Sequence, residues 1–217
     1  DYAISLKMVL ELREIKVSEI TGAIIGSVVP PVTSLMREAI RKVTGQEALV
    51  VNVDMNIGLE VLMDNPSSVG TDLIVGAVAG INRYPVPLIL IDMGTATTIC
   101  VVNENKQYIG GMILPGIGVS MNSLTSRTAQ LPRISLDPPK RLIGKNTVEC
   151  MQSGALYGNA SCIDGMVDRI QEELGQEATI VATGGLAKRI IPLCRHRIEL
   201  DDELLLQGLW IIYEKNK

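Results

Sequence analysis

Residues 92–98, with the sequence DMGTATT, place one carboxylate, one glycine and three threonines between two apolar runs of the chain. Gly94 lets the backbone turn tightly and lets a ligand approach without meeting a side chain. Thr95 and the two threonines after it supply hydroxyl groups, and the N–H groups of such a turn form a concavity that suits an anion. Asp92 can hold a cation that screens a phosphate. The segment therefore predicts a phosphate site with a metal ion, and a plain β-hairpin of small residues explains it equally well.

A second glycine turn follows an apolar run at residues 181–185, with the sequence VATGG. Gly184 and Gly185 precede a segment with a helical pattern, and the free N–H groups of a helix N-terminus suit a nucleotide phosphate or sugar. Many α/β proteins contain such a turn, so it is weak evidence alone. Two of them in one chain favour nucleotide binding.

Two further polar residues are candidates because each stands in the first turn of an expected helix. Asp72 can stabilise the helix dipole, which is the common role of an acid there. It can also orient an alcohol and accept its proton late in a phosphoryl transfer. Thr147 can cap a long helix, or it can present its hydroxyl to a polar ligand. Both pairs of interpretations stay open from the sequence.

The spacing of apolar residues predicts the elements that position these groups. In the first half we expect helices at 1–13, 33–43 and 69–81 and strands at 22–30 and 48–53. In the second half we expect strands at 86–92, 97–103, 106–114 and 178–185, a short strand near His196, and helices at 119–127, 146–175 and 201–215. The long segment 146–175 is either one helix or two that break at Gly158.

The two halves alternate helices and strands in a similar way, and the match would be complete if three strands preceded Asp1. We therefore expect an α/β fold of two similar lobes, 1–85 and 86–217, with the first lobe truncated at its N-terminus. A cleft between lobes is a usual place for a ligand.

Composition excludes several classes of function. Lys and Arg are scattered over a chain of net charge −4 with few aromatic residues, so we expect no nucleic acid partner. One histidine and four widely spaced cysteines cannot build a zinc cluster at the usual spacings. No apolar run approaches the ~18 residues that span a bilayer, so we expect no membrane partner. Without a signal peptide, the cysteines predict reduced thiols and a cytoplasmic protein.

Seven segments together resemble the type III pantothenate kinases, a family of the acetate and sugar kinase, Hsp70 and actin superfamily. They follow the family order across nearly the whole chain, and the combination is far more specific than any one of them. The matching segments are SVVPP at 27–31, VGTD at 69–72, DMGTATT at 92–98, GGMILPG at 110–116, LTSRTAQLP at 124–132, GKNTVECMQSGALYGN at 144–159 and ATGGLAK at 182–188.

The resemblance implies two ribonuclease H-like lobes and an enzyme that phosphorylates the primary hydroxyl of pantothenate with ATP. This reaction, which yields 4'-phosphopantothenate, is the first step toward coenzyme A. The resemblance also implies a homodimer with the substrate pocket near the subunit interface, Mg2+ bound with ATP, and a monovalent cation, K+ or NH4+. The residues it implies are Asp72 as catalytic base, Asp92 as cation ligand, Gly94, Thr95, Gly184 and Gly185 for ATP, and Gly70, Thr71, Asp72, Leu73, Thr147 and Met63 for pantothenate.

Three departures from the family pattern leave alternatives open. The family's first phosphate loop, Asp-x-Gly-Asn-Thr, does not occur in this chain, and a chain without it is expected to bind ATP poorly and not to turn over. Leu73 stands where the family usually has Arg, and Met63 where it usually has Tyr. Because pantothenate carries a carboxylate, replacing Arg by Leu removes a matching cation. The alternatives are a paralogue on the same fold that phosphorylates another small alcohol, and a non-catalytic paralogue that binds a nucleotide or metabolite.

Overall fold

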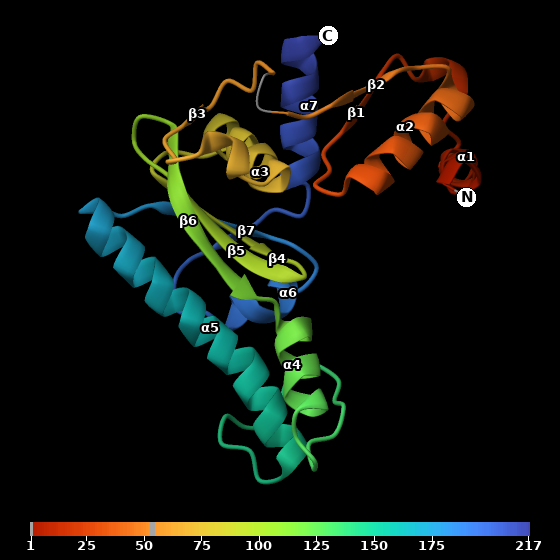
Figure 1. Ribbon diagram of the computed structural model, residues 1–217. Helices are drawn as coiled ribbons and strands as arrows, with labels where there is room; N and C mark the ends of the chain where they lie inside the picture. Colours follow the sequence, from red (N-terminus) through yellow and green to blue (C-terminus); the bar gives the residue numbers. More distant parts are fainter. Residues whose placement is uncertain (1, 53–54) are drawn as a thin grey trace. The chain divides into compact units, whose positions relative to one another are not determined.

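The computed structural model describes residues 2–52 and 55–217, and it confirms the α/β class (Figure 1). The helices are α1 (Tyr2–Leu12), α2 (Pro30–Thr44), α3 (Thr71–Arg83), α4 (Ile117–Ser126), α5 (Thr147–Leu174), α6 (Ala187–Ile190) and α7 (Leu204–Asn216). The strands are β1 (Ala23–Ile25), β2 (Ala48–Val50), β3 (Glu60–Val61), β4 (Leu88–Met93), β5 (Ala96–Val102), β6 (Gln107–Pro115), β7 (Thr179–Thr183) and β8 (Glu199–Leu200). No described helix is both long and apolar enough to cross a bilayer.

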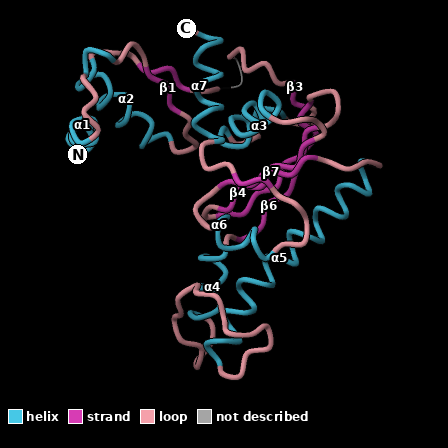
Figure 2. The backbone as a smooth tube through the Cα atoms, turned by 180° about the vertical axis from the view of Figure 1, so that it is seen from behind, coloured by secondary structure: helices cyan, strands magenta, loops and turns pink. Residues whose placement is uncertain are grey.

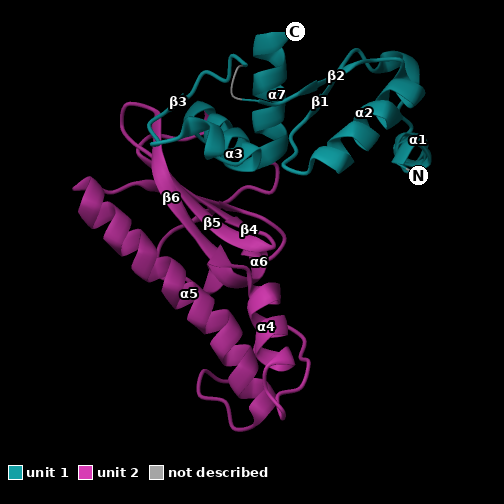
Figure 3. Cartoon of the chain, in the orientation of Figure 1, with its two compact units in different colours: residues 1–82, 204–217 teal, residues 83–203 magenta. Residues whose placement is uncertain are grey.

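The chain forms two compact units, one of residues 1–82 and 204–217 and one of residues 83–203 (Figure 3). The sequence hypothesis placed the boundary at residue 85 and assigned 204–217 to the second lobe. In the structure α7 instead packs within the first unit, where a Cβ on Gly208 would overlap the carbonyl of Val75. Leu209 of the same helix lies over Gly26. Apolar periodicity predicts a helix here, but it carries no information about the elements to which the helix returns.

In the first unit, β1 and β2 form a parallel pair with Ala23 opposite Ala48. The helix α2 starts at Pro30, although the sequence analysis took this proline as the end of a strand. Proline is well tolerated at the first helical position, because the N–H that it lacks would have no partner there. The helix ends at Gly45, two residues beyond the expected range of 33–43, and the φ of +72° at this position favours glycine.

In the second unit the strand order is β6-β5-β4-β7-β8. The three strands expected between residues 86 and 114 are confirmed, and β4, β5 and β6 pair antiparallel as a meander. On the other side of β4, β7 pairs with it in parallel, and β8 pairs in parallel with β7. Ile89, Ile91 and Met93 alternate toward one face, which α5 and α6 cover with apolar side chains (Figures 1 and 2). The other face carries Asp92, and its position there brings it to the candidate site.

The long segment after the α4 loop is one helix, so the alternative of a break at Gly158 is wrong. The helix α5 runs for 28 residues and ends at Gly175, whose φ is +67°. Glycine inside a helix costs about 1 kcal/mol relative to alanine. Burial of Leu156 and Ala160 on either side of Gly158 compensates for this cost.

Candidate active site

The second unit gathers polar side chains at the carboxyl ends of β4 and β7. Asp92 lies opposite Thr98 of β5 and beside Thr183 of β7 in the strand register, so the three side chains share one face of the sheet. Ligands of open α/β sheets bind outside the carboxyl ends of the parallel strands. The sequence analysis did not single out Thr183, although its alternation with the core residues Ile180 and Ala182 would have placed it on the face of Asp92.

The two glycine turns, predicted separately, are in contact in the structure. Gly184 has a φ of +97°, and a Cβ on it would lie 2.6 Å from Asp92 Oδ1 and 2.6 Å from the backbone N of Met93. Only glycine therefore allows the second turn to approach the first. A Cβ on the neighbouring Gly185 would meet no atom within 4 Å, so a ligand can approach the backbone there. The helix α6 that follows has only four residues and supplies little dipole.

The turn between β4 and β5 is arranged differently from the sequence expectation in two respects. The N–H of Gly94 donates to the carbonyl of Ala96 at 3.0 Å, so Gly94 offers room to a ligand rather than a hydrogen-bond donor. Thr97 is 4% exposed and lies beside Met93 on the core face, where its Oγ1 has no partner among the described residues. Side chains alternate along a strand, so Thr97 is turned away from the site that Thr98 faces. Thr95, at the tip of the turn, is exposed.

Asp92 and the two hydroxyl-bearing residues beside it in the strand register bring oxygen atoms together on one face of the sheet. Among the described residues no group of three or more His, Cys, Asp or Glu side chains is placed to hold a metal ion. Asp92 is half-buried and brings one negative charge next to the neutral hydroxyl-bearing residues Thr98 and Thr183.

In the first unit, Asp72 occupies the first turn of α3 as predicted, and its side chain is exposed. Its Oδ1 accepts a hydrogen bond from the N–H of Leu73 at 3.0 Å. A Cβ on Gly70 would lie 2.5 Å from the same oxygen, so glycine at that position leaves room for the carboxylate. These local contacts stabilise the start of the helix and leave the carboxylate exposed.

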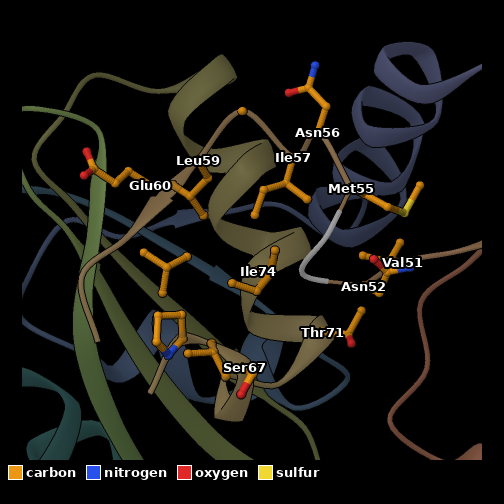
Figure 4. A pocket seen from close by; sticks show the side chains of 14 residues that line it. Val51, Asn52, Met55, Asn56, Ile57, Leu59, Glu60, Ser67, Thr71 and Ile74 are labelled. Carbon is orange, nitrogen blue, oxygen red and sulfur yellow. The ribbon is translucent and has the colours of Figure 1, made fainter. Parts of the chain in front are cut away.

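A cavity of about 670 Å³ lies next to the N-terminal half of α3 in the first unit (Figure 4). Thr71 lines it, whereas Gly70, Asp72, Leu73 and Met63 are not among its lining residues. The walls are Val51, Asn52, Met55, Asn56, Ile57, Gly58, Leu59, Glu60, Val61, Pro66, Ser67, Val69, Thr71 and Ile74. Glu60 is the one ionisable side chain in this described lining, which is otherwise apolar or neutral.

Thr147 is the first residue of α5, and it is not the cap of the helix. The cap is Asn146, whose side chain accepts a hydrogen bond from the N–H of Glu149 at 2.9 Å. Glu149 in turn accepts from the N–H of Lys145 at 3.0 Å, and this bond is the main reason that the pKa of Glu149 is lowered. Thr147 is exposed.

Comparison with known proteins decides the family. The family described as type III pantothenate kinase matches residues 1–169, which is more than half of the chain. The chain belongs to the type III pantothenate kinase family. A curated type III pantothenate kinase from Bacillus cytotoxicus is 44% identical over 216 residues, covering 100% of this chain and 82% of the relative. The resemblance inferred from the seven segments is therefore confirmed.

Solved structures support the fold of this type III pantothenate kinase family member. A conserved Baf family protein from Campylobacter jejuni, named as a transcriptional activator, matches with a TM-score of 0.60 and 18% identity, over 95% of this chain and 87% of that one. Component A of (R)-2-hydroxyglutaryl-CoA dehydratase from Acidaminococcus fermentans matches with a TM-score of 0.52 and 13% identity, over 97% of this chain and 82% of that one. At these identities the likeness shows that the chain shares its fold with these two proteins, and it shows nothing further.

Proposed function

We propose that this chain catalyses the reaction after which its family is named, the ATP-dependent phosphorylation of pantothenate to 4'-phosphopantothenate. The observation that carries the proposal is the contact between the two glycine turns, in which Gly184 packs on Asp92 at the carboxyl ends of β4 and β7. Such a place suits a nucleotide phosphate. Membership of the family supplies the acceptor alcohol.

The chemistry assigns a role to Asp72. In phosphoryl transfer the hydroxyl oxygen of the acceptor bonds to the γ-phosphorus, the bond between that phosphorus and the bridging oxygen of ADP breaks, and the hydroxyl proton passes to a base. Asp72 carries an exposed carboxylate, and its Oδ1 is held by the N–H of Leu73. We assign the proton to its Oδ2. Gly70, Thr71, Leu73, Met63 and Thr147 are the proposed contacts of the acceptor.

The nucleotide and its cations are assigned to the second unit. Gly94, Thr95, Gly184 and Gly185 are the proposed contacts of ATP, and the open space at Gly185 favours this assignment. Mg2+ would accompany ATP and neutralise charge that develops on its phosphates. Asp92 is the proposed ligand of K+ or NH4+, for which its single negative charge is suited.

We further propose that the active form is a cytoplasmic homodimer. Apolar side chains that are 41% exposed or more gather on α4 and around the start of α5, at Val119, Leu124, Leu142, Ile143 and Val148. Thr147 lies within this group, which agrees with a substrate pocket close to a subunit interface. The four cysteines are free thiols in the structure, as the reducing cytoplasm favours.

A second candidate keeps the reaction and changes the acceptor. The described lining of the cavity beside α3 contains no Lys, Arg or His that could receive the carboxylate of pantothenate. Leu73 adds no cation where the family usually has Arg. Both observations favour an uncharged alcohol of similar length.

Initial rates of ATP consumption test both candidates. The assay compares pantothenate with pantothenyl alcohol, which carries a hydroxyl in place of the carboxylate, each with and without K+. We expect ATP consumption that depends on pantothenate and on K+. A rate that does not respond to pantothenate refutes the first candidate, and a higher kcat/KM for pantothenyl alcohol supports the second.

Substitution of Asp72 tests the assignment of the base. Asp72→Asn keeps an oxygen that can accept from the N–H of Leu73, so the start of α3 should be preserved while the proton acceptor is lost. General bases contribute typically 10²- to 10⁴-fold, so kcat should fall by about that factor. Asp168→Asn, on the exposed side of α5, is the matched control. Near wild-type turnover of Asp72→Asn would show that another group takes the proton.

A further inference from the structure

The side chain of Asn216, in the last turn of α7, forms two hydrogen bonds with the backbone of Asn56, a residue in the wall of the cavity. Its Oδ1 accepts from the N–H of Asn56 at 3.0 Å, and its Nδ2 donates to the carbonyl of Asn56 at 3.0 Å. Nδ2 also donates to the carbonyl of Ile212 at 2.8 Å. The amide thus uses its oxygen and both of its N–H groups, and it pairs with Asn56 as a neighbouring strand would.

The helix α7, which carries Asn216, is packed firmly within the first unit, so its hydrogen bonds to Asn56 tie the cavity wall to a well-packed helix. Ile212 is fully buried, and Gly208 lies so close to α3 that a Cβ would overlap the carbonyl of Val75. On the other side of the contact, Asn56 directly precedes Ile57 and Leu59, which are buried and line the cavity (Figure 4).

A second contact of α7 falls on the same stretch of the wall. Gly58 has a φ of +66°, and a Cβ on it would overlap Lys215 Nζ. From residue 55 to residue 70 the chain forms only the two-residue strand β3 and a 3-10 turn at Pro66–Ser68, and the rest has no regular secondary structure. Its conformation near the cavity therefore depends on contacts from outside the segment, and α7 supplies two in succession.

We propose that Asn216 is a positioning residue of the acceptor pocket, which fixes through Asn56 the place of Ile57 and Leu59 in the cavity wall. The inference rests on the proposed function in that Thr71, a proposed contact of the acceptor, lines this cavity beside α3. Asn216 does not touch the acceptor. Removing the Asn216 amide makes the cavity wall more mobile and therefore weakens binding of the acceptor. The same change leaves the glycine turns of the second unit unchanged.

Hydrogen exchange and steady-state kinetics of Asn216→Ala test the proposal. Exchange in peptides covering residues 55–61 is measured without substrate, since the N–H of Asn56 loses its acceptor. The KM for pantothenate should rise about five- to tenfold, the effect of losing about one net hydrogen bond, while kcat and the KM for ATP stay within about twofold. Asn216→Gln retains the amide and should recover part of the loss. Glu214→Ala is the matched control, because Glu214 lies in the same turn and pairs with Lys217 instead.

The outcomes separate the positioning role from simple stability and from the proposed function. Faster exchange confined to residues 55–61, together with a raised KM for pantothenate alone, supports the proposal. Unchanged exchange overturns it, and so does faster exchange with an unchanged KM for pantothenate. Equal rises in both KM values with a lowered melting temperature overturn it as well, because they indicate general loosening. A wild-type chain that does not use pantothenate refutes the proposed function, and exchange, which needs no substrate, then decides whether Asn216 holds the wall.

Discussion

Replacing Gly184 by alanine should damage stability and nucleotide binding together, because two separate costs meet at this residue. The φ of +97° is unfavourable for any L side chain, and a left-handed conformation costs roughly 1–2 kcal/mol. The new Cβ would also lie 2.6 Å from Asp92 Oδ1 and 2.7 Å from the carbonyl carbon of Met93. Overpacking of this kind costs typically about 1–3 kcal/mol, so the sum is about 2–5 kcal/mol.

Two other glycines separate these costs, since each of them carries only one. Gly175 ends α5 with a φ of +67°, and a Cβ there would meet nothing within 4 Å, so Gly175→Ala measures the conformational cost alone. A Cβ on Gly111 would overlap the carbonyl of Ile99 and lie 2.9 Å from the Cα of Cys100, so Gly111→Ala measures the packing cost alone. All three glycines belong to the second unit.

Urea unfolding of the three variants, followed by circular dichroism, gives the comparison. We expect the midpoint of Gly184→Ala to fall further than that of Gly175→Ala, with an unchanged m value. Because the Cβ displaces Asp92, the KM for ATP should also rise. Equal midpoints for Gly184→Ala and Gly175→Ala would mean that the second turn does not press on Asp92, and the geometry on which the nucleotide site rests would be wrong.

Three further predictions concern ionisable groups away from the site. Burial, then a hydrogen bond to Asp201 at 2.9 Å, raises the pKa of Tyr84, so Asp201→Asn should lower that pKa in an alkaline absorbance titration against wild type. Burial and the nearby carboxylate of Asp164 raise the pKa of Cys194 to about 12, so iodoacetamide at pH 8 should label the exposed Cys150 and spare Cys194, as peptide mass spectrometry would show. The lowered pKa of Glu149 adds stability above its unfolded value of 4.5 that is lost as pH falls through the folded value, so Glu149→Gln should reduce the fall in unfolding midpoint between pH 6 and pH 3.

The sequence predicted the second unit well because local rules determine its elements. Short turns between apolar runs predict an antiparallel meander, and β4, β5 and β6 form one. Glycines in turns at the ends of strands predict close backbone approach, and Gly184 packs on Asp92. Individual side chains were predicted less well. Thr97 and Thr98 are adjacent in one polar motif, yet the pleat sends them to opposite faces, and the register was not available from the sequence.

The first unit was harder to predict because its elements depend on partners far away in the chain. Proline both ends strands and begins helices, so the apolar run before Pro30 predicted the end of a strand, whereas in the structure α2 begins at this proline. The return of α7 to this unit has no local signal. Its packing on Val75 through Gly208 is visible only in three dimensions.

Some features of the molecule are determined by local sequence and others by contacts between distant residues. This difference explains why a motif reveals the phosphate chemistry but not the acceptor specificity. The proposed nucleotide site is made largely of backbone, and the glycines that let this backbone approach closely stand at fixed places in a motif, so the motif predicts the site. The cavity proposed for the acceptor is lined by side chains on an irregular stretch, and Asn216 forms hydrogen bonds to Asn56 of that stretch from 160 positions away in the chain. A change of Leu73, Glu60 or the α7 contact can therefore alter the acceptor without altering any phosphate motif. Acceptor choice in this family member has to be measured on the cavity and its supports, since the motifs that identify the family report mainly on the nucleotide.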